Sequence, residues 1–284
     1  MSGTIVIPEQ PGFLMCGAWG DPHYTTFDGK VHHFQGVGVF NYASDCKENR
    51  FHVYTKQERC GRGTVSCISA VIIEVQAFPV RIVIGRRGAF SPTITALPPD
   101  IFEVLRVGST YTVNILPLNV TVSYDGSHTV SVKVPKSTFY NATCGLCGNG
   151  NENPSDDFQA LVNGSLRRVT NVNEFGLSWA NFNLSQELNC AVSHVTPEPC
   201  GGSKRRRAEE FCRQLRTQAI NTGCVDAISP LEFINNCIFD YCAGETAAGV
   251  VEDFSEVCSH FIRYSSMCAE VLGTASDIFN ECRK

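Results

Sequence analysis

Apolar and polar residues alternate along much of residues 37–135, and this alternation predicts β-strands. The clearest β-branched runs are residues 71–76, 80–84, 111–115 and 130–134. Successive side chains of a strand point to opposite faces, so a period of two places one face of each run in a core. Turn residues such as Gly85, Gly88 and Gly126 separate the runs. This arrangement is typical of antiparallel hairpins in a β-sandwich.

The last part of the chain has a helical spacing instead. Residues 208–216 and 253–264 place apolar side chains and cysteines three and four positions apart, which predicts amphipathic helices. Residues 194–207 are rich in proline, glycine and charge, as linkers are. We therefore expect a tail at 1–15, a β domain at 16–190, a linker at 191–208, and a small disulfide-rich α-helical domain at 209–284 to which Cys200 of the linker contributes.

Charge and apolar run lengths exclude two classes of protein. The 284 residues carry a net charge of −5 and are 18% charged, so the basic surface of a nucleic-acid binder is absent. No apolar run approaches the ~20 residues that a membrane span needs. The first residues also lack the pattern of a signal peptide. Since the features described next indicate secretion, we expect the chain to be a piece of a longer secreted protein.

Cysteines and glycosylation triplets indicate an extracellular location. Fifteen cysteines spread along the chain fit a disulfide framework formed in an oxidising compartment. Four Asn-x-Ser/Thr triplets are further signs of secretion. Their asparagines are Asn119, Asn141, Asn163 and Asn183. The sequence therefore predicts a secreted or extracellular glycoprotein.

Several motifs occur in a fixed order. Cys16-x-x-Trp-Gly-Asp-Pro-His-Tyr-x-Thr-Phe-Asp-Gly29 comes first, Phe34-x-Gly36 follows, and Cys144-Gly-Leu-Cys-Gly-Asn149 comes later. With these motifs the chain resembles a von Willebrand factor type D domain. The cysteines around Cys237-Ile-Phe-Asp-Tyr-Cys242 resemble the eight-cysteine module that follows this domain. The resemblance implies a mainly β fold, an antiparallel β-sandwich followed by a small disulfide-rich α-helical domain. It also implies a structural and assembly role in a larger mucin-like or extracellular-matrix glycoprotein.

The resemblance also implies a disulfide pairing, which eight cysteines alone would not decide. The implied pairs are Cys16–Cys147, Cys46–Cys144, Cys60–Cys67, Cys200–Cys242, Cys212–Cys237, Cys224–Cys268 and Cys258–Cys282. Cys190 is left unpaired, because its usual partner position holds Gly38. Two interpretations stay open for Cys190: a buried free thiol or local re-pairing, and an intermolecular disulfide.

Residues 149–157 are a candidate metal site. Asparagines alternate with other residues and two aspartates follow, so every second side chain can point toward a hard cation. Asparagine-rich loops are also common as plain turns. The resemblance favours Ca²⁺, bound by this loop together with the aspartate of Thr-Phe-Asp-Gly in a structural role. The implied ligands are Asp28, Asn149, Asn151, Asn153, Asp156 and Asp157.

The Asp21–Pro22 bond is a candidate for self-cleavage. An aspartate carboxylate can attack its own carbonyl carbon, and the proline nitrogen is a good leaving group. His23 is placed to supply or organise protons. The resemblance implies such a cut for some Gly-Asp-Pro-His sites, and the alternative is a tight turn shaped by Gly20 and Pro22. Cys16 precedes the bond and Cys147 follows it, so a cut chain would stay joined.

The remaining motifs favour no turnover of an external substrate. Phosphate loops and the common hydrolase motifs are absent, so we expect no enzyme beyond a single self-cleavage. Cys144 and Cys147 have the spacing of redox or zinc sites, which keeps a disulfide-assembly catalyst as an alternative. His32 and His33 suggest a metal but also fit the start of a strand. The basic run at 204–207 is either solvated, a binding site for anionic glycans, or a processing site in an exposed loop.

Expected partners follow from this interpretation. We expect other extracellular glycoproteins or copies of the chain itself, and neither nucleic acid nor a membrane span in this fragment. The alternative function is a ligand-binding module that recognises immunoglobulin Fc or egg-coat glycans.

Overall fold

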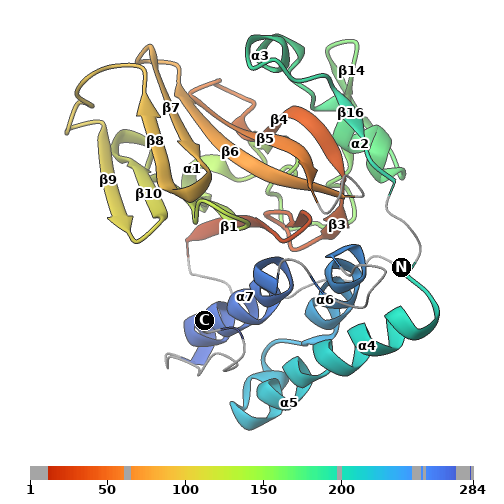
Figure 1. The fold of residues 1–284 in the computed structure, drawn as a ribbon. Coiled ribbons are helices and arrows are strands. Elements are labelled where there is room, and N and C mark those ends of the chain that lie inside the picture. Colours follow the sequence, from red (N-terminus) through yellow and green to blue (C-terminus); the bar gives the residue numbers. More distant parts are fainter. Residues whose placement is uncertain are drawn as a thin grey trace.

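The computed structural model describes residues 12–60, 65–196, 200–244, 251, 254–272 and 282. Two β-sheets face each other, and helices of the C-terminal part pack below them against β1 to β3 (Figure 1). This architecture confirms the predicted fold class, a mainly antiparallel β-sandwich followed by a disulfide-rich helical region. Among the described helices, none is long and apolar enough to cross a membrane.

The first sheet is antiparallel and has the strand order β3-β2-β1-β12-β11-β10-β9. Buried and partly buried residues alternate along β10, β11 and most of β12, as their period-two sequence predicts. The strands of this first sheet are β1 (Phe13–Trp19), β2 (His23–Thr25), β3 (Val31–His33), β9 (Phe102–Val107), β10 (Thr110–Ile115), β11 (Val120–Tyr124) and β12 (Val130–Pro135).

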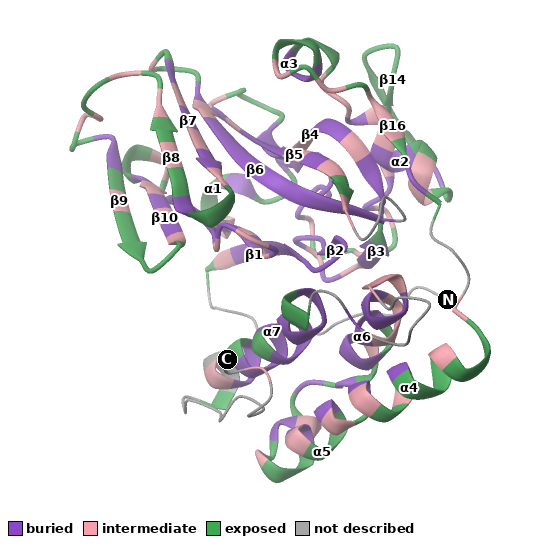
Figure 2. Cartoon of the chain, in the orientation of Figure 1, coloured by how far each residue is buried: buried purple, intermediate pink, exposed green. Residues whose placement is uncertain are grey.

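The second sheet has the order β13-β4-β5-β6-β7-β8, and β16 also pairs with β4. Strand β6 is buried along nearly its whole length (Figure 2). The strands of this second sheet are β4 (Gly36–Asp45), β5 (Phe51–Cys60), β6 (Val65–Val75), β7 (Val80–Gly85), β8 (Ala89–Pro92), β13 (Thr143–Cys144) and β16 (Ser193–His194). A separate hairpin consists of β14 (Gln159–Val162) and β15 (Ser165–Arg168).

Seven α-helices lie among the described residues. The short helices α1 to α3 belong to the β domain, and α4 to α7 form the helical module. The helices are α1 (Lys136–Phe139), α2 (Val172–Ser178), α3 (Phe182–Glu187), α4 (Gly202–Cys212), α5 (Gln214–Asn221), α6 (Leu231–Gly244) and α7 (Phe254–Leu272). Short 3-10 helices lie at Arg86–Gly88, Leu116–Leu118 and Cys224–Asp226.

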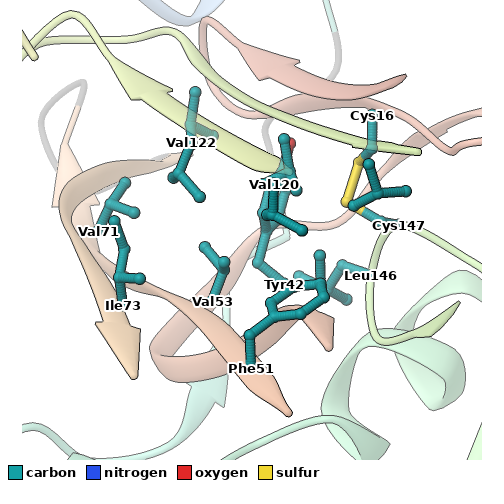
Figure 3. Packing of buried hydrophobic residues seen from close by; sticks show 14 of the residues in the cluster. Cys16, Tyr42, Phe51, Val53, Val71, Ile73, Val120, Val122, Leu146 and Cys147 are labelled. Carbon is teal, nitrogen blue, oxygen red and sulfur yellow. A yellow bond between two sulfur atoms is a disulfide. The ribbon is translucent and has the colours of Figure 1, made fainter. Parts of the chain in front are cut away.

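The space between the two sheets is filled by a large apolar core. Figure 3 shows part of it, with Val53, Val71 and Ile73 of the second sheet opposite Val120 and Val122 of the first. A second core lies inside the helical module, and it includes Trp19 and Val31 from the β domain. Because these two side chains lie in the helical core, the modules share a packed apolar interface.

Two segments expected to lie outside the domains contain strands or a helix. The tail expected at 1–15 ends earlier, because Phe13 already pairs with Pro135 in β1; residues 1–11 lie outside the described residues. The linker expected at 191–208 is shorter, because β16 and α4 occupy parts of it. The basic run of 204–207 therefore lies in a helix, where its residues are good helix formers and Arg205 pairs with Glu209.

Candidate functional site

The Asp21–Pro22 bond lies in a buried turn between β1 and β2. Strand β1 ends at Trp19 and pairs there with His23, the first residue of β2. Gly20 has a φ of +61°, a left-handed conformation that favours glycine. Asp21 is 0% exposed and His23 is 1% exposed. The candidate bond is therefore enclosed, which excludes bulk water and strengthens electrostatic interactions around it.

The carbonyl group of Asp21 has an oriented hydrogen-bond donor. Nε2 of Gln35 donates to this carbonyl oxygen. The other end of the same amide, Oε1, accepts from the backbone N–H of Ser66 at 2.7 Å. Since Oε1 is held by a group that only donates, the amide of Gln35 must direct its NH₂ toward Asp21. Gln35 is itself buried.

His23 belongs to a buried cluster that crosses the module interface. Its Nε2 lies 2.7 Å from Oδ1 of Asp240 on α6. Oδ2 of the same carboxylate lies 2.7 Å from Nε2 of His260 on α7. Nδ1 of His260 accepts a hydrogen bond from the indole N–H of Trp19 at 2.9 Å. On its other side, Nδ1 of His23 lies 2.7 Å from Nδ1 of His33.

A second group of candidate ligands lies beside Asp21. Asp21, Cys60, Cys67 and Glu256 place one ligand atom each within 4.8 Å of one another. Cys60 and Cys67 form a disulfide, so neither offers a thiolate to a metal. Two carboxylates from opposite modules therefore lie close together next to the candidate bond.

The turn after β2 meets the loop after β13 at Asp28. The backbone N–H groups of Asn151 and Glu152 donate to its carboxylate at 3.1 and 2.6 Å. The hydroxyl of Thr26 donates to Asp157 at 2.6 Å. The structure therefore brings the two segments of the predicted calcium site together, although they are more than a hundred residues apart in sequence.

The asparagine side chains of this loop surround Asp156. The amide nitrogens of Asn149, Asn151 and Asn153 lie 3.0 to 3.2 Å from its carboxylate oxygens. Rotation of an amide by 180° exchanges its nitrogen for its oxygen, so these side chains can also present oxygen atoms. Among the described residues, no hydrogen bond reaches Oδ1 of Asn149, which is buried. A hard cation would satisfy such an atom.

The electrostatics of this loop also suit a cation. Burial, together with the nearby charge of Asp28, raises the pKa of Asp157 to about 8. Burial likewise raises the pKa of Asp28. These shifts mean that the ionised carboxylates lack sufficient positive charge nearby. Because all candidate donors are carboxylate or amide oxygens, the chemistry of the set fits Ca²⁺.

Fourteen of the cysteines form seven disulfides in the structure. The pairs are Cys16–Cys147, Cys46–Cys144, Cys60–Cys67, Cys200–Cys242, Cys212–Cys237, Cys224–Cys268 and Cys258–Cys282. These are the same pairs that the resemblance implies. Cys144 and Cys147 each pair with a distant cysteine and both are buried, so they do not form the Cys-x-x-Cys disulfide of a redox catalyst.

Cys190 has a free thiol in the structure and is partly buried. Its Sγ lies 3.4 Å from the carbonyl oxygen of Ser185. Gly38 has a φ of +128°, and a Cβ there would lie 3.1 Å from Val192. A side chain at position 38 would therefore be strained in this backbone conformation. Whether Cys190 pairs with another molecule stays a prediction.

Exposure distinguishes the remaining sequence features. The four triplet asparagines Asn119, Asn141, Asn163 and Asn183 are all exposed, as glycan attachment requires. His32 is buried in β3 and Nε2 of its ring lies 2.9 Å from the Leu146 carbonyl oxygen, so it has a structural partner. The basic run of α4 would have to unwind before a protease could cut it, which weakens the processing interpretation.

Sequence reasoning missed three residues of the cleavage region, namely Gln35, Asp240 and His260. Gln35 lies inside Phe34-x-Gly36, and nothing in the neighbouring sequence indicates that its amide contacts the Asp21 carbonyl. Asp240 lies inside Cys237-Ile-Phe-Asp-Tyr-Cys242. An aspartate between two aromatic residues on an apolar helix could have indicated a buried carboxylate with a specific partner. A charged residue in such a position is rarely fully buried without a partner.

Comparison with known proteins gives one family. A family model for the von Willebrand factor type D domain matches residues 16–163, which confirms the predicted resemblance. Human alpha-tectorin is 28% identical over 259 residues, covering 86% of this chain and 12% of alpha-tectorin. Human IgGFc-binding protein is 31% identical over 293 residues, covering 95% of this chain and 5% of that protein. Pig zonadhesin is 30% identical over 268 residues, covering 91% of this chain and 10% of zonadhesin. The chain thus spans 5% to 12% of the length of these relatives.

Proposed function

Because the chain belongs to the von Willebrand factor type D domain family, we propose that it is a calcium-binding assembly module of a larger mucin-like or extracellular-matrix glycoprotein, and that it cuts its own Asp21–Pro22 bond once. Its disulfides and extracellular relatives indicate a secreted or extracellular protein. The observation that carries the self-cleavage is the buried Asp21 carbonyl, to which Gln35 donates a hydrogen bond.

The reaction needs no group from outside the chain except water. A carboxylate oxygen of Asp21 attacks the carbonyl carbon of the same residue, and a five-membered anhydride forms. The bond from that carbon to the nitrogen of Pro22 breaks as the nitrogen takes a proton from Nδ1 of His23, since Nε2 of that ring is held by Asp240. Water then opens the anhydride and releases protons that restore His23. The products are a C-terminal Asp21 and an N-terminal Pro22.

Gln35 is suited to stabilise the charge that develops in this step. When the carboxylate attacks, the carbonyl oxygen of Asp21 becomes an oxyanion. A donor that is already oriented toward this atom stabilises it without any cost of reorganisation. The hydrogen bond from Ser66 fixes Gln35 in this orientation, so the donor is in place before the reaction begins.

We expect Gln35→Glu to slow the cut by about 10²- to 10³-fold, the usual cost of losing one oxyanion donor. Glutamate keeps the acceptor for Ser66 but removes the NH₂ group that faces Asp21. The matched control is Gln57→Glu, since Gln57 is also fully buried and its Nε2 donates to Tyr24 instead. The rate is measured from the appearance of the Pro22 N-terminus by mass spectrometry after reduction. Equal rates in wild type and Gln35→Glu would contradict this role.

Calcium would tie the N-terminal turn to the loop of residues 149–157. Asp28, Asp156 and Asp157 would supply carboxylate oxygens, and Asn149, Asn151 and Asn153 would supply amide or carbonyl oxygens. A bound Ca²⁺ supplies the positive charge that the clustered carboxylates lack. Its role would be structural, because Cys144 and Cys147, each in a disulfide, directly precede the loop.

We expect Ca²⁺ at one hundred times its Kd to stabilise the folded protein by about 2.7 kcal/mol, since it binds the folded state alone. Thermal unfolding with Ca²⁺ and with a chelator measures this difference. Asp157→Asn should remove most of the response, whereas Asp100→Asn, at an exposed aspartate outside the loop, should leave it intact. A melting temperature that is unaffected by Ca²⁺ in the wild-type protein would refute the site.

A further inference from the structure

The motif Gly20-Asp21-Pro22-His23 lies against the helical module. A Cβ atom on Gly20 would lie 2.3 Å from Oδ2 of Asp240, so only glycine permits this approach. His23, on the other side of the candidate bond, lies 2.7 Å from Oδ1 of the same carboxylate. Both flanks of the bond therefore meet one side chain of α6, which is 217 residues from His23 in sequence.

The proton positions in this cluster follow from Trp19. An indole N–H can only donate, so Nδ1 of His260 must accept and its proton must be on Nε2. This Nε2–H donates to Oδ2 of Asp240. Burial lowers the pKa of His260, in agreement with a neutral ring. The other carboxylate oxygen of Asp240, Oδ1, then accepts the hydrogen bond from Nε2–H of His23.

This proton arrangement argues against a metal in the cluster. His23, Asp240 and His260 have ligand atoms within 4.8 Å of one another, and two histidines with one carboxylate are a common ligand set. A histidine must offer a nitrogen without a proton to bind a metal. Trp19 occupies the free nitrogen of His260, and the nitrogen that faces Asp240 carries the proton. The nitrogens of this cluster that face Asp240 therefore carry protons and donate hydrogen bonds to it.

We propose that Asp240 is a positioning residue for cleavage at Asp21–Pro22, acting through His23, so that the bond breaks only when the helical module is docked on the β domain. This inference rests on the proposed self-cleavage. It differs from that proposal because it assigns a requirement to the helical module, whereas Asp21, Pro22 and Gln35 all belong to the β domain.

Asp240 would act on the orientation of the His23 ring. Its carboxylate holds Nε2–H of His23, as the aspartate of a catalytic triad holds its histidine. Burial opposes the charge of Asp240, but the attraction of His23 and His260 and their hydrogen bonds hold its pKa below the usual range. With Nε2–H held by Asp240, Nδ1 is the ring nitrogen of His23 left to give a proton to Pro22, and His33 lies 2.7 Å from it.

His33 gives this arrangement a connection to solvent. His33 is exposed, and its Nδ1 lies 2.7 Å from Nδ1 of the buried His23. One of these two nitrogens must carry a proton, so the two rings share a hydrogen bond along which a proton can move between them. The titratable groups in contact with His23 are thus His33 on β3, Asp240 on α6 and His260 on α7.

The test uses the full chain secreted from animal cells, as wild type and as Asp240→Asn. We expect the substitution to slow the appearance of the Pro22 N-terminus by about 10²-fold at neutral pH. The loss should require His23, because the carboxylate of Asp240 contacts the ring of His23. A role in folding alone would lower the rate equally with His23 present and with His23 replaced by glutamine.

Two controls make the result specific. Asp226→Asn replaces an exposed aspartate of the same module and should cut at the wild-type rate. In a His23→Gln background, Asp240→Asn should cause no further loss, because Asp240 acts through His23. If Asp240→Asn is not secreted, ¹⁵N NMR of the wild-type histidines still tests the cluster. A proton on Nδ1 of His260 instead of Nε2 would overturn it.

The outcomes separate the two proposals. A wild-type chain that never cuts would overturn the self-cleavage, and the positioning role with it. A wild-type chain that cuts while Asp240→Asn cuts equally fast at every pH would overturn the positioning role alone and leave the self-cleavage standing. Slower cutting in Asp240→Asn, with no further loss in the His23→Gln background, supports both.

Discussion

Replacing both Cys16 and Cys147 by serine is expected to lower the free energy of unfolding by about 5 kcal/mol. The two residues are 131 positions apart, and a bridge that closes so long a loop removes much of the conformational entropy of the unfolded chain. Their side chains also lie in the core between the sheets, near Tyr42 and Leu146 (Figure 3). The double substitution avoids leaving one unpaired thiol there.

The matched control is the double substitution of Cys60 and Cys67, which are only 7 positions apart. The same entropy relation predicts a loss of about 2.5 kcal/mol for so short a loop. Urea unfolding followed by circular dichroism measures both. If the two double variants lose equal stability, loop length is not the source of the effect.

Trp19→Ala is expected to lower the free energy of unfolding by about 3–5 kcal/mol, the usual cost of emptying a buried tryptophan site. Trp19 is 1% exposed and stacks on Phe233 of α6 with ring centroids 5.7 Å apart. Its N–H also donates to His260 of α7. The lost contacts therefore join the two modules, and their docking should weaken together with the overall stability.

Trp179→Ala provides the comparison for this result. Trp179 is also buried, but it belongs to the core of the β domain. Both variants should lose stability, yet only Trp19→Ala should increase amide hydrogen exchange in α6 and α7 at concentrations of denaturant that leave the β-sheets protected. Equal exchange in the two variants would show that Trp19 does not couple the modules.

The sequence predicted most strands because they carry a strong local pattern. Residues 80–84, 111–115 and 130–134 alternate with period two, and each lies in a strand with alternating burial. The short strand β2 was missed, since three residues are too few to show a period, whereas His32 and His33 were noted as fitting a strand and lie in β3. Helix α4 was also missed in its first turns, because two glycines and a charged run resemble a linker.

The candidate sites were predicted only as far as their residues lie in motifs. Asp28 and the loop of 149–157 were found through the family resemblance, and the structure places them together. Asp240 and His260 were not found, since their roles come from contacts that span the two modules. Gln35 was not found for a similar reason: the orientation of its amide depends on Ser66, which lies on another strand.

A cut at Asp21–Pro22 would leave the fold connected. Cys16 is the sole cysteine before the bond in the sequence, and it pairs with Cys147. Strand β1 also pairs with β12 from Phe13 to Ala18. The N-terminal piece is therefore held by one covalent bridge and by a full strand in the first sheet.

The most direct test is the intact mass of the secreted wild-type chain with and without reduction, after incubation at neutral pH and at about pH 6, where histidine side chains take up protons. The account predicts one species before reduction, with the mass of the full chain plus one water. After reduction it predicts two species, one of which begins at Pro22. A chain that remains uncut under both conditions, or an N-terminal piece that leaves without reduction, would contradict it.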